Sequence, residues 1–236
     1  MKGLALASSL IIVTTVGVST TAKAATPDEN LNRSSEVFSE IMSAPDKGIP
    51  QDLLDKAQCV IIIPELLKGA FLVGGEWGHG FAECRNADGR GWGAPAAMKL
   101  EGGSVGFQLG GSDTQLVLLV MNRHGMDELT RDKVTLGADA SVAAGPVGRS
   151  ANAQTDLKLS AQMLAWSRTK GAFAGVALNG ASLRPDKSAN EKLYGRPLNT
   201  REILMGDVRP TTGAKPLIAT LDRYSSRQGE ASRTEH

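Results

Sequence analysis

Residues 59–84 read CVIIIPELLKGAFLVGGEWGHGFAEC, and this stretch decides the fold. Val60 to Ile63 is a β-branched run, which favours a strand, and we expect Pro64 to end it. Residues 70–73 and 80–84 predict two further strands, separated by Gly-rich turns. The chain around this stretch is therefore predicted to be a sheet of short, closely spaced strands.

The rest of the chain extends this pattern. Asp88-Gly89 predicts a turn, and Gly102-Gly103 predicts a tight reversal into an alternating strand at Val105, Phe107 and Leu109. Further strands are predicted over residues 96–100, 116–121, 133–137, 157–163 and 172–183, with a short helix within 122–131.

Helices are predicted at both ends of the chain. Thr26 is an N-cap candidate, Pro27 follows at the first helical position, and apolar residues then recur at helical spacing to Ser43. Shorter helices are predicted over residues 50–56, 190–194, 200–205 and 216–224. The predicted class is α+β: a β-rich, mainly antiparallel barrel-like or sandwich-like sheet with flanking short helices.

Composition excludes several classes of protein. The 236 residues are 41% hydrophobic and 22% charged, with 26 Lys and Arg against 25 Asp and Glu. That balance excludes a wholly disordered chain and a generic polycation, so we expect no nucleic-acid partner.

Glycine is abundant at 27 residues, 13 of them between Gly69 and Gly111, whereas aromatic residues make up only 4%. This favours closely approaching strands over a helical bundle.

The first 24 residues have the pattern of a secretory signal peptide. A charged start, an apolar run over residues 4–18 and Ala22-Lys23-Ala24 predict cleavage after Ala24. A retained membrane anchor is the alternative, but about 15 apolar residues fall short of the roughly 20 that a spanning helix needs. No Cys lies near the predicted cut, so we do not expect a lipid-modified N-terminus. We expect an exported protein, periplasmic or secreted.

The predicted organisation has four parts. They are a signal peptide (1–24), an N-terminal helical segment (25–52), one domain with C-terminal helices (53–224) and a flexible tail (225–236).

Residues 25–148 hold 10 basic and 17 acidic groups, whereas residues 149–236 hold 14 and 8. The two parts either neutralise each other in the fold or leave a basic face that attracts anionic head groups. We expect a membrane-facing surface in the basic last part.

Export also bears on Cys59 and Cys84, because disulfides persist outside the cytosol. An even number of cysteines favours one disulfide, which would close a 26-residue loop and stabilise the fold by about 3 kcal/mol. A pair of buried free thiols is the alternative.

Motifs for catalysis are weak. Residues 102–106 match the G-x-S-x-G pattern, with Ser104 as nucleophile and Asp113 and His124 as partners on paper. The pattern requires a following helix, whereas the residues that follow alternate like a strand. The glycines of residues 74–80 match no phosphate-binding motif, and no paired metal-ligand motif stands near His79. We expect no enzyme activity, no metal and no cofactor, and interpret His79 as a surface or hairpin residue.

Aromatic and basic residues near the predicted turns offer one candidate binding surface. Tryptophan prefers the lipid interface, and Lys or Arg pairs with phosphate. The candidate head-group residues are Lys68, Arg85, Arg90 and Trp77, and the other tryptophans are Trp92 and Trp166. The alternative for each of them is an ordinary core or rim residue.

Several long motifs resemble the SYLF domain family, in the form found in exported bacterial proteins. They are CVIIIP (59–64), KGAF (68–71), GGEWGHG (74–80), GWGAP (91–95), EGGSVGFQLGG (101–111), ADASVAAGPVGR (138–149) and GAFAGV (171–176). The resemblance covers residues 53–194.

The resemblance implies a noncatalytic module that binds lipid and is associated with phosphoinositides. Eukaryotic members act at membranes, and some bind or bundle actin. Their membrane binding is attributed largely to a basic amphipathic N-terminal helix, whereas the matching residues 27–43 here carry four acids against Arg33 alone. We therefore expect binding of anionic phospholipid or another amphiphile at the cell envelope. The alternatives are an envelope structural or protein-interaction domain and a Ser104 hydrolase.

Overall fold

One curled sheet forms the centre of the molecule. The computed structural model describes residues 25–44, 48–71, 73–104, 114–147, 161–169, 172–176 and 178–225. Within them the strands are β1 (Cys59–Phe71), β2 (Val73–Cys84), β3 (Ala96–Ser104), β4 (Thr114–Val120), β5 (Val134–Thr135), β6 (Val142–Ala144), β7 (Met163–Thr169), β8 (Ala172–Gly175) and β9 (Ser182–Pro185).

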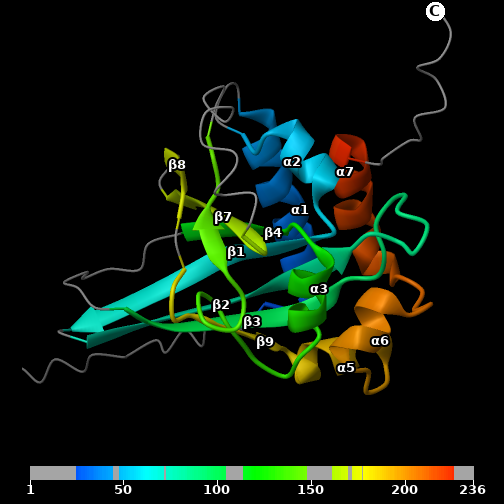
Figure 1. The fold of residues 1–236 in the computed structure, drawn as a ribbon. Coiled ribbons are helices and arrows are strands. Elements are labelled where there is room, and N and C mark those ends of the chain that lie inside the picture. Colours follow the sequence, from blue (N-terminus) through cyan, green and yellow to red (C-terminus); the bar gives the residue numbers. More distant parts are fainter. Residues whose placement is uncertain are drawn as a thin grey trace, which may run out of the picture.

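These strands form one sheet in the order β5-β9-β3-β2-β1-β4-β7-β6, with β8 also paired to β7. All the pairings are antiparallel except that of β6 with β7. The sheet curls into a half-barrel (Figure 1). The predicted α+β class with a mainly antiparallel, barrel-like sheet is therefore confirmed.

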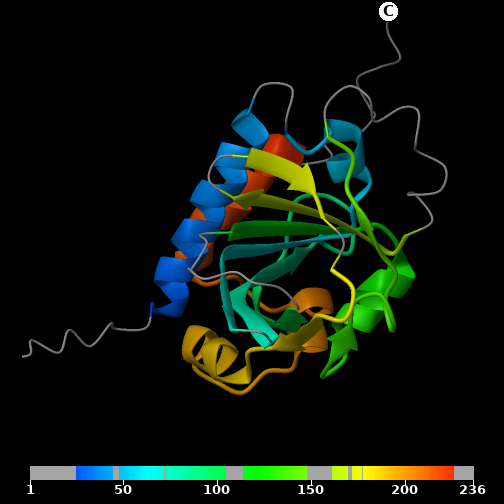
Figure 2. The same cartoon turned by 90° about the vertical axis from the view of Figure 1, so that its left-hand side faces the viewer.

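The helices lie on both sides of this sheet. They are α1 (Pro27–Ser43), α2 (Gln51–Lys56), α3 (Arg123–Leu129), α5 (Lys187–Tyr194), α6 (Thr200–Met205) and α7 (Lys215–Ser225), with a short 3-10 turn at Thr212–Ala214. Helices α1 and α7 pack side by side against one face (Figure 2). No helix in the described part of the chain is long and apolar enough to cross a membrane.

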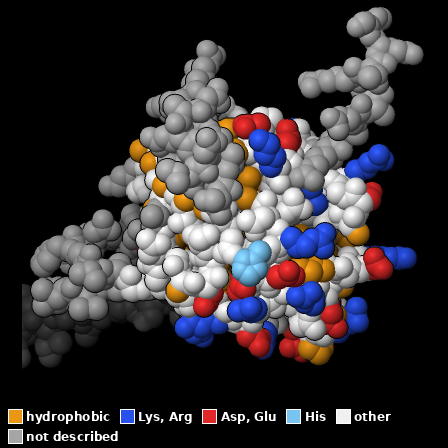
Figure 3. Space-filling model, viewed as in Figure 1, with side chains coloured by type: hydrophobic (Ala, Val, Ile, Leu, Met, Phe, Trp, Pro, Cys, Tyr) orange, Lys and Arg blue, Asp and Glu red, His pale blue; other side chains and the backbone are white. Residues whose placement is uncertain are grey.

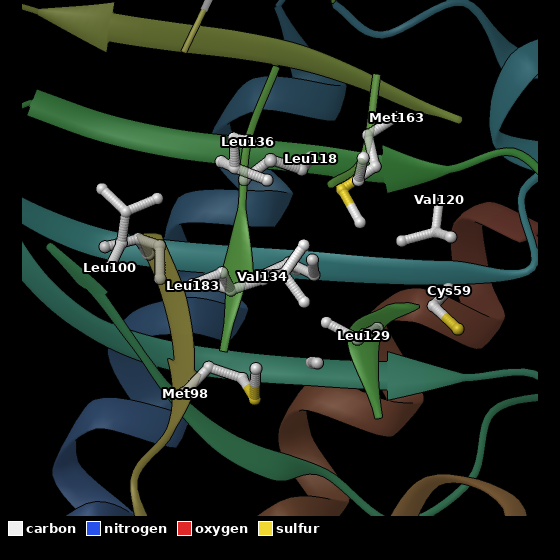
Figure 4. Close-up of a cluster of buried hydrophobic side chains, with 14 of the residues drawn as sticks. Cys59, Met98, Leu100, Leu118, Val120, Leu129, Val134, Leu136, Met163 and Leu183 are labelled. Atoms are coloured by element: carbon white, nitrogen blue, oxygen red, sulfur yellow. The ribbon is translucent and has the colours of Figure 1, made fainter. Parts of the chain in front are cut away.

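Alternation along the strands divides the apolar residues into two cores. Val60 and Ile62 face α1, α2 and α7, together with Leu31, Phe38 and other buried residues of those helices. Ile61 and Ile63 point to the inside of the curl, where Figure 4 shows residues of several strands gathered around the short strand β5. Because successive side chains of a strand point to opposite faces, a strand buried on both sides is apolar on both faces, as β4 is from Leu116 to Val120.

The β1–β2 hairpin contains the sharpest irregularity of the sheet. Its register shifts between Ile62 and Glu65, where Pro64 lies, and the register of β1 with β4 shifts at the same place. Proline lacks an N–H, and a β-bulge is one of the few sites in a sheet that accepts it. The prediction that Pro64 ends the strand is therefore wrong, because the bulge carries β1 on to Phe71.

Glycines of β2 make room for this bulge. A Cβ on Gly80 would lie 1.9 Å from the carbonyl oxygen of Ile62, and a Cβ on Gly78 would lie 2.6 Å from Cγ2 of Ile63. Both distances are far below van der Waals contact. The absence of side chains at Gly78 and Gly80 therefore allows the bulged strand to stay paired with β2.

Other predicted strand limits are also wrong. Gly102 and Gly103 continue β3 opposite Glu76 and Gly75 instead of reversing the chain. The single strand predicted over residues 172–183 is two strands, β8 and β9, with Gly180 between them at a φ of 87°. The strand predicted over 133–137 is only two residues long, and β7 begins at Met163, so it shares only that residue with the strand predicted over 157–163.

Some predictions fall outside the described residues. They are the signal peptide, the alternating strand at residues 105–109, residues 157–160 of the strand predicted over 157–163, and the tail from residue 226 onward.

The predicted cysteine pair joins the open end of the hairpin. Cys59 and Cys84 are direct partners in the register of β1 and β2, their sulfur atoms lie 2.00 Å apart, and both residues are buried. The disulfide therefore fastens the same two strands that the bulge distorts further along.

Glu83 of β2 is a carboxylic acid buried in the sheet. Glu83 is 1% exposed, and among the described residues neither of its carboxyl oxygens has a hydrogen-bond partner. Burial raises the pKa of Glu83 well above its usual range, and the negative charge of Asp222 on α7 raises it further. Glu83 is therefore protonated in the folded protein at pH values where the unfolded chain has lost that proton.

We expect replacement of Gly80 by alanine to lower the free energy of unfolding by about 2–3 kcal/mol, because the added methyl group meets the β1 backbone. Gly103→Ala is the matched control, since a Cβ there meets nothing within 4 Å. Its stability should stay within about 1 kcal/mol of the parent. Urea unfolding measures both variants, and equal stabilities of the two would contradict the close contact.

The buried acid gives a pH dependence with a defined sign. Above the ordinary Glu pKa the unfolded chain releases its proton while the folded chain keeps it, so the contribution of Glu83 to stability falls as pH rises toward its raised pKa. We expect Glu83→Gln to gain stability relative to the parent by about 1.4 kcal/mol per pH unit in this range. Exposed Glu36→Gln is the control and should show no such gain. A pH-independent difference between Glu83→Gln and the parent would contradict the assignment.

Candidate binding groove

A groove lies on the face of the sheet that α1 and α7 cover, between the N-terminal end of α1 and helix α5. Figure 2 shows these two helices on the same side of the strands, and they contact each other. The groove has a volume of about 450 Å³ and is open to solvent. Its lining residues are Ala25, Pro27, Asn30, Arg33, Pro64, Glu65, Leu67, Trp77, Gly78, His79, Gly80, Phe81, Ala97, Met98, Lys99, Asp186, Ser188, Ala189 and Lys192. We call it the α1–α5 groove.

The bulge of β1 and the facing part of β2 form the floor of this groove. Pro64 and Leu67 come from the first strand, and Trp77 and His79 from the second. Leu67 and Trp77 are direct partners in the register, so their side chains lie on the same face. Trp77 is 47% exposed, and among the described residues it is the one large hydrophobic residue that is exposed. The floor therefore offers an accessible apolar surface.

The polar wall centres on Asp186 at the N-terminus of α5. Its Oδ2 lies 2.9 Å from Nδ1 of His79, its Oδ1 lies 3.5 Å from Nζ of Lys99, and it caps α5 by accepting from the amide of Ala189. Burial of Asp186 acts to raise its pKa, but the His79 hydrogen bond, the Ala189 amide and Lys99 outweigh it, and the pKa is lowered. Asp186 is therefore a stable anion that holds His79 and Lys99 in the groove.

Cations exceed anions along the lining. Arg33 forms a 3.0 Å ion pair with Glu65 at the α1 side, and Lys99 pairs with Asp186. Lys192 is exposed and forms no ion pair among the described residues. With three Lys or Arg against two carboxylates, the groove carries one net positive charge even when His79 is neutral. An anion with an apolar part is complementary to this combination.

The four head-group candidates do not converge. Trp77 lines the groove, whereas Arg85 and Arg90 follow the opposite end of β2, beyond Cys84. The strand between Trp77 and Cys84 is roughly 20 Å long. Lys68 pairs through its backbone with Glu76 near the hairpin tip, and its side chain lies outside the described residues.

Arg85 is buried and binds backbone carbonyl groups. It is 8% exposed, and its guanidinium donates to the carbonyl oxygens of Leu54, Ala57 and Ser225 at 3.2, 3.1 and 2.9 Å. It also stacks 4.2 Å above the ring of Trp92. The carbonyls belong to the C-terminal ends of α2 and α7, where a cation is favourable. Arg85 therefore joins two helices to the sheet and does not face the groove.

The other tryptophans are also inside the fold. Trp92 and Trp166 are 3% and 0% exposed, and the indole of Trp92 donates to the carbonyl oxygen of Ser225 at 3.0 Å. Arg90 is exposed in the turn after β2, where Asp88 accepts from its amide at 2.9 Å. Of the predicted aromatic residues, only Trp77 is thus available to a ligand in the α1–α5 groove.

Sequence reasoning missed most of the groove. Arg33, Lys99, Asp186 and Lys192 come from three different elements, α1, β3 and α5, and His79 was interpreted as a surface or hairpin residue. The alternation of Trp77 and His79 on one strand was the available signal for a shared face. The predicted basic last part supplies only one of the three Lys and Arg residues, Lys192, because the fold brings the others from the acidic first part.

A second cleft, of about 560 Å³, lies between the ends of α3, α5 and α6. Its Arg131, Lys187 and Arg201 each pair with an acid, namely Glu128, Asp132 and Asp127. Figure 3 shows the same mixture of positive and negative side chains over these helices. Over its own lining the cleft has three Lys or Arg against Asp132 alone, but all three are held in ion pairs and no aromatic residue lines the cleft. The α1–α5 groove differs in offering the exposed Trp77 and Lys192, which forms no ion pair among the described residues.

Comparison with known proteins identifies the family of this chain. The family model described as Ysc84, Las17-binding protein actin regulator, matches residues 101–224, more than half of the chain. SH3 domain-containing YSC84-like protein 1 of Bos taurus is 33% identical over 193 residues, which are 80% of this chain and 56% of that protein. The protein of the same name from Homo sapiens is equally similar.

A yeast protein gives a similar match. LAS seventeen-binding protein 3 of Saccharomyces cerevisiae is 35% identical over 180 residues, which are 75% of this chain and 39% of that protein. The chain thus spans about half or less of the length of the curated relatives it matches. With the family model covering more than half of its residues, the chain belongs to the Ysc84 family and carries its SYLF domain, as the motifs of residues 53–194 indicate.

Proposed function

We propose that this chain is a noncatalytic protein of the cell envelope that binds anionic phospholipid through the α1–α5 groove. The observation that carries the proposal is the exposed Trp77 beside a groove with net positive charge. An indole favours the boundary between the apolar and polar parts of a lipid, and Lys or Arg favours its phosphate. The SYLF resemblance points to the same ligand class.

A hydrolase is the weaker assignment. The relatives are named for a domain or for a binding partner, not for a reaction. His124, the base proposed on paper, lies on α3 with its Nε2 4.0 Å from Glu128. Asp113 and the side chain of Ser104 lie outside the described residues. Loss of an esterase activity in Ser104→Ala would support the hydrolase instead.

A protein partner in the envelope is the second candidate. It is favoured by the names of the relatives, since both the family model and the yeast protein are described as Las17-binding. A domain of this kind would leave vesicles of every charge unbound while still capturing its partner.

Vesicle co-sedimentation separates these functions. We expect residues 25–236 to pellet with phosphatidylglycerol vesicles far more than with phosphatidylcholine vesicles, and less at 300 mM than at 50 mM salt because exposed charges are screened. No difference between the two vesicles would contradict the head-group role of the groove.

Two substitutions should act in opposite directions. Lys192→Gln removes a cation and should weaken binding about fivefold, whereas Asp186→Asn removes an anion but retains an N-cap residue, and should strengthen it by a similar factor. Arg90→Gln is the control outside the groove. A loss confined to Arg90→Gln would instead support the turn-based prediction from sequence.

Export is the remaining part of the proposal, supported by the signal-peptide pattern and by the Cys59–Cys84 pair. We expect the protein recovered from the cell envelope to have the mass of residues 25–236 with no alkylatable thiol before reduction and two after it. Mass spectrometry with and without reductant measures both. An intact N-terminus on the recovered protein would contradict cleavage, and thiols that react without reduction would contradict the disulfide.

A further inference from the structure

We propose that the α1–α5 groove takes up one molecule of a single-chain anionic amphiphile, such as an alkyl phosphate or a fatty acid, out of the lipid phase. This inference rests on the proposed function and specifies its ligand: an individual molecule lying in the groove instead of a bilayer surface against it.

The first support is the division of the groove into a polar and an apolar part. His79 and Lys99 are direct partners in the β2–β3 register, and Lys192 of α5 lines the same side. Trp77 lies two residues from His79 along β2, with Leu67 opposite it on β1. An anionic group at Lys99 and Lys192 would therefore place an attached chain along Trp77 and Leu67.

The second support is size. A volume of about 450 Å³ lies within the range of small-molecule sites and corresponds to about fifteen groups of the size of a water molecule. This is room for one head group and the first part of one chain. Two long acyl chains would not be enclosed, so a single-chain molecule fits the groove better than a diacyl phospholipid.

The third support is the position and exposure of Trp77. Trp77 is 47% exposed and lies in the groove floor, so part of its surface is covered by the fold and the rest is open to a bound chain. An apolar chain that covers this exposed surface is stabilised by its removal from water. Together with the neighbouring cations, Trp77 selects for molecules that are both apolar and anionic.

Intrinsic fluorescence tests this inference directly, because Trp92 and Trp166 are buried and Trp77 is exposed. Decyl phosphate, added to residues 25–236 below its micelle-forming concentration, should give a saturable blue shift with one molecule bound per chain. Decanol and inorganic phosphate should each bind at least tenfold more weakly. In Trp77→Phe the shift should vanish, while calorimetry still detects binding.

Substitutions identify the site. Lys192→Gln should weaken decyl phosphate binding about fivefold, whereas Lys56→Gln, an exposed cation of α2 outside the groove, should leave it unchanged. Equal effects of the two substitutions would overturn the placement of the ligand.

Failure of the inference is distinguishable from failure of the proposed function. Binding to phosphatidylglycerol vesicles without binding of decyl phosphate overturns the uptake of single molecules and leaves surface binding in place. Inorganic phosphate binding as tightly as decyl phosphate overturns the amphiphile and leaves only an anion site. Absence of binding to both vesicles and decyl phosphate overturns both proposals.

Discussion

The close approach of β1 and β2 at the bulge is the constraint on which the remaining structure depends. Gly80 and Gly78 allow the backbone around Ile62 and Ile63 to come nearer than any side chain would permit. The register shift that results is matched on the other side of β1 by the shift against β4. The bulge thus bends the central strand of the sheet while both neighbours stay paired, and bulges are a common source of such bending.

The same contact shapes the groove. Pro64 and Glu65 at the bulge, and Gly78 to Gly80 opposite, all line the α1–α5 groove. His79 lies on the same face of β2 as Trp77, and its Nδ1 is 2.9 Å from Oδ2 of Asp186 at the N-terminus of α5. At the far end of the hairpin, the Cys59–Cys84 pair joins the two strands, and Arg85 fixes them to α2 and α7. The structural cation Arg85 therefore lies away from the Lys and Arg residues of the groove.

Local signals in the sequence predicted the helices well. Thr26 and Glu29 form a capping box around Pro27, and α1 has the bounds that these residues indicate. The predicted end of β1 at Pro64 and the predicted turn at Gly102-Gly103 were wrong, because both segments stay paired with β2. This pairing depends on residues distant in sequence, which local turn signals do not include.

The candidate site was harder to predict for the same reason. Trp77 was identified because a tryptophan beside basic residues near turns can engage a lipid surface. Arg85 was assigned to head groups because its acceptors, the carbonyls of Leu54 and Ser225, cannot be recognised as neighbours from the sequence. The partners of Trp77 in the groove come together only when α1 and α5 fold onto the sheet.

Chemical-shift mapping by NMR tests the central claim, that the groove at the bulge is the lipid site. On addition of phosphatidylglycerol bicelles to isotope-labelled residues 25–236, we expect the largest changes at the Trp77 indole and the amides of His79, Lys99 and Ala189. Changes confined to the turn around Arg90, or to the cleft between α3 and α6, would contradict the account.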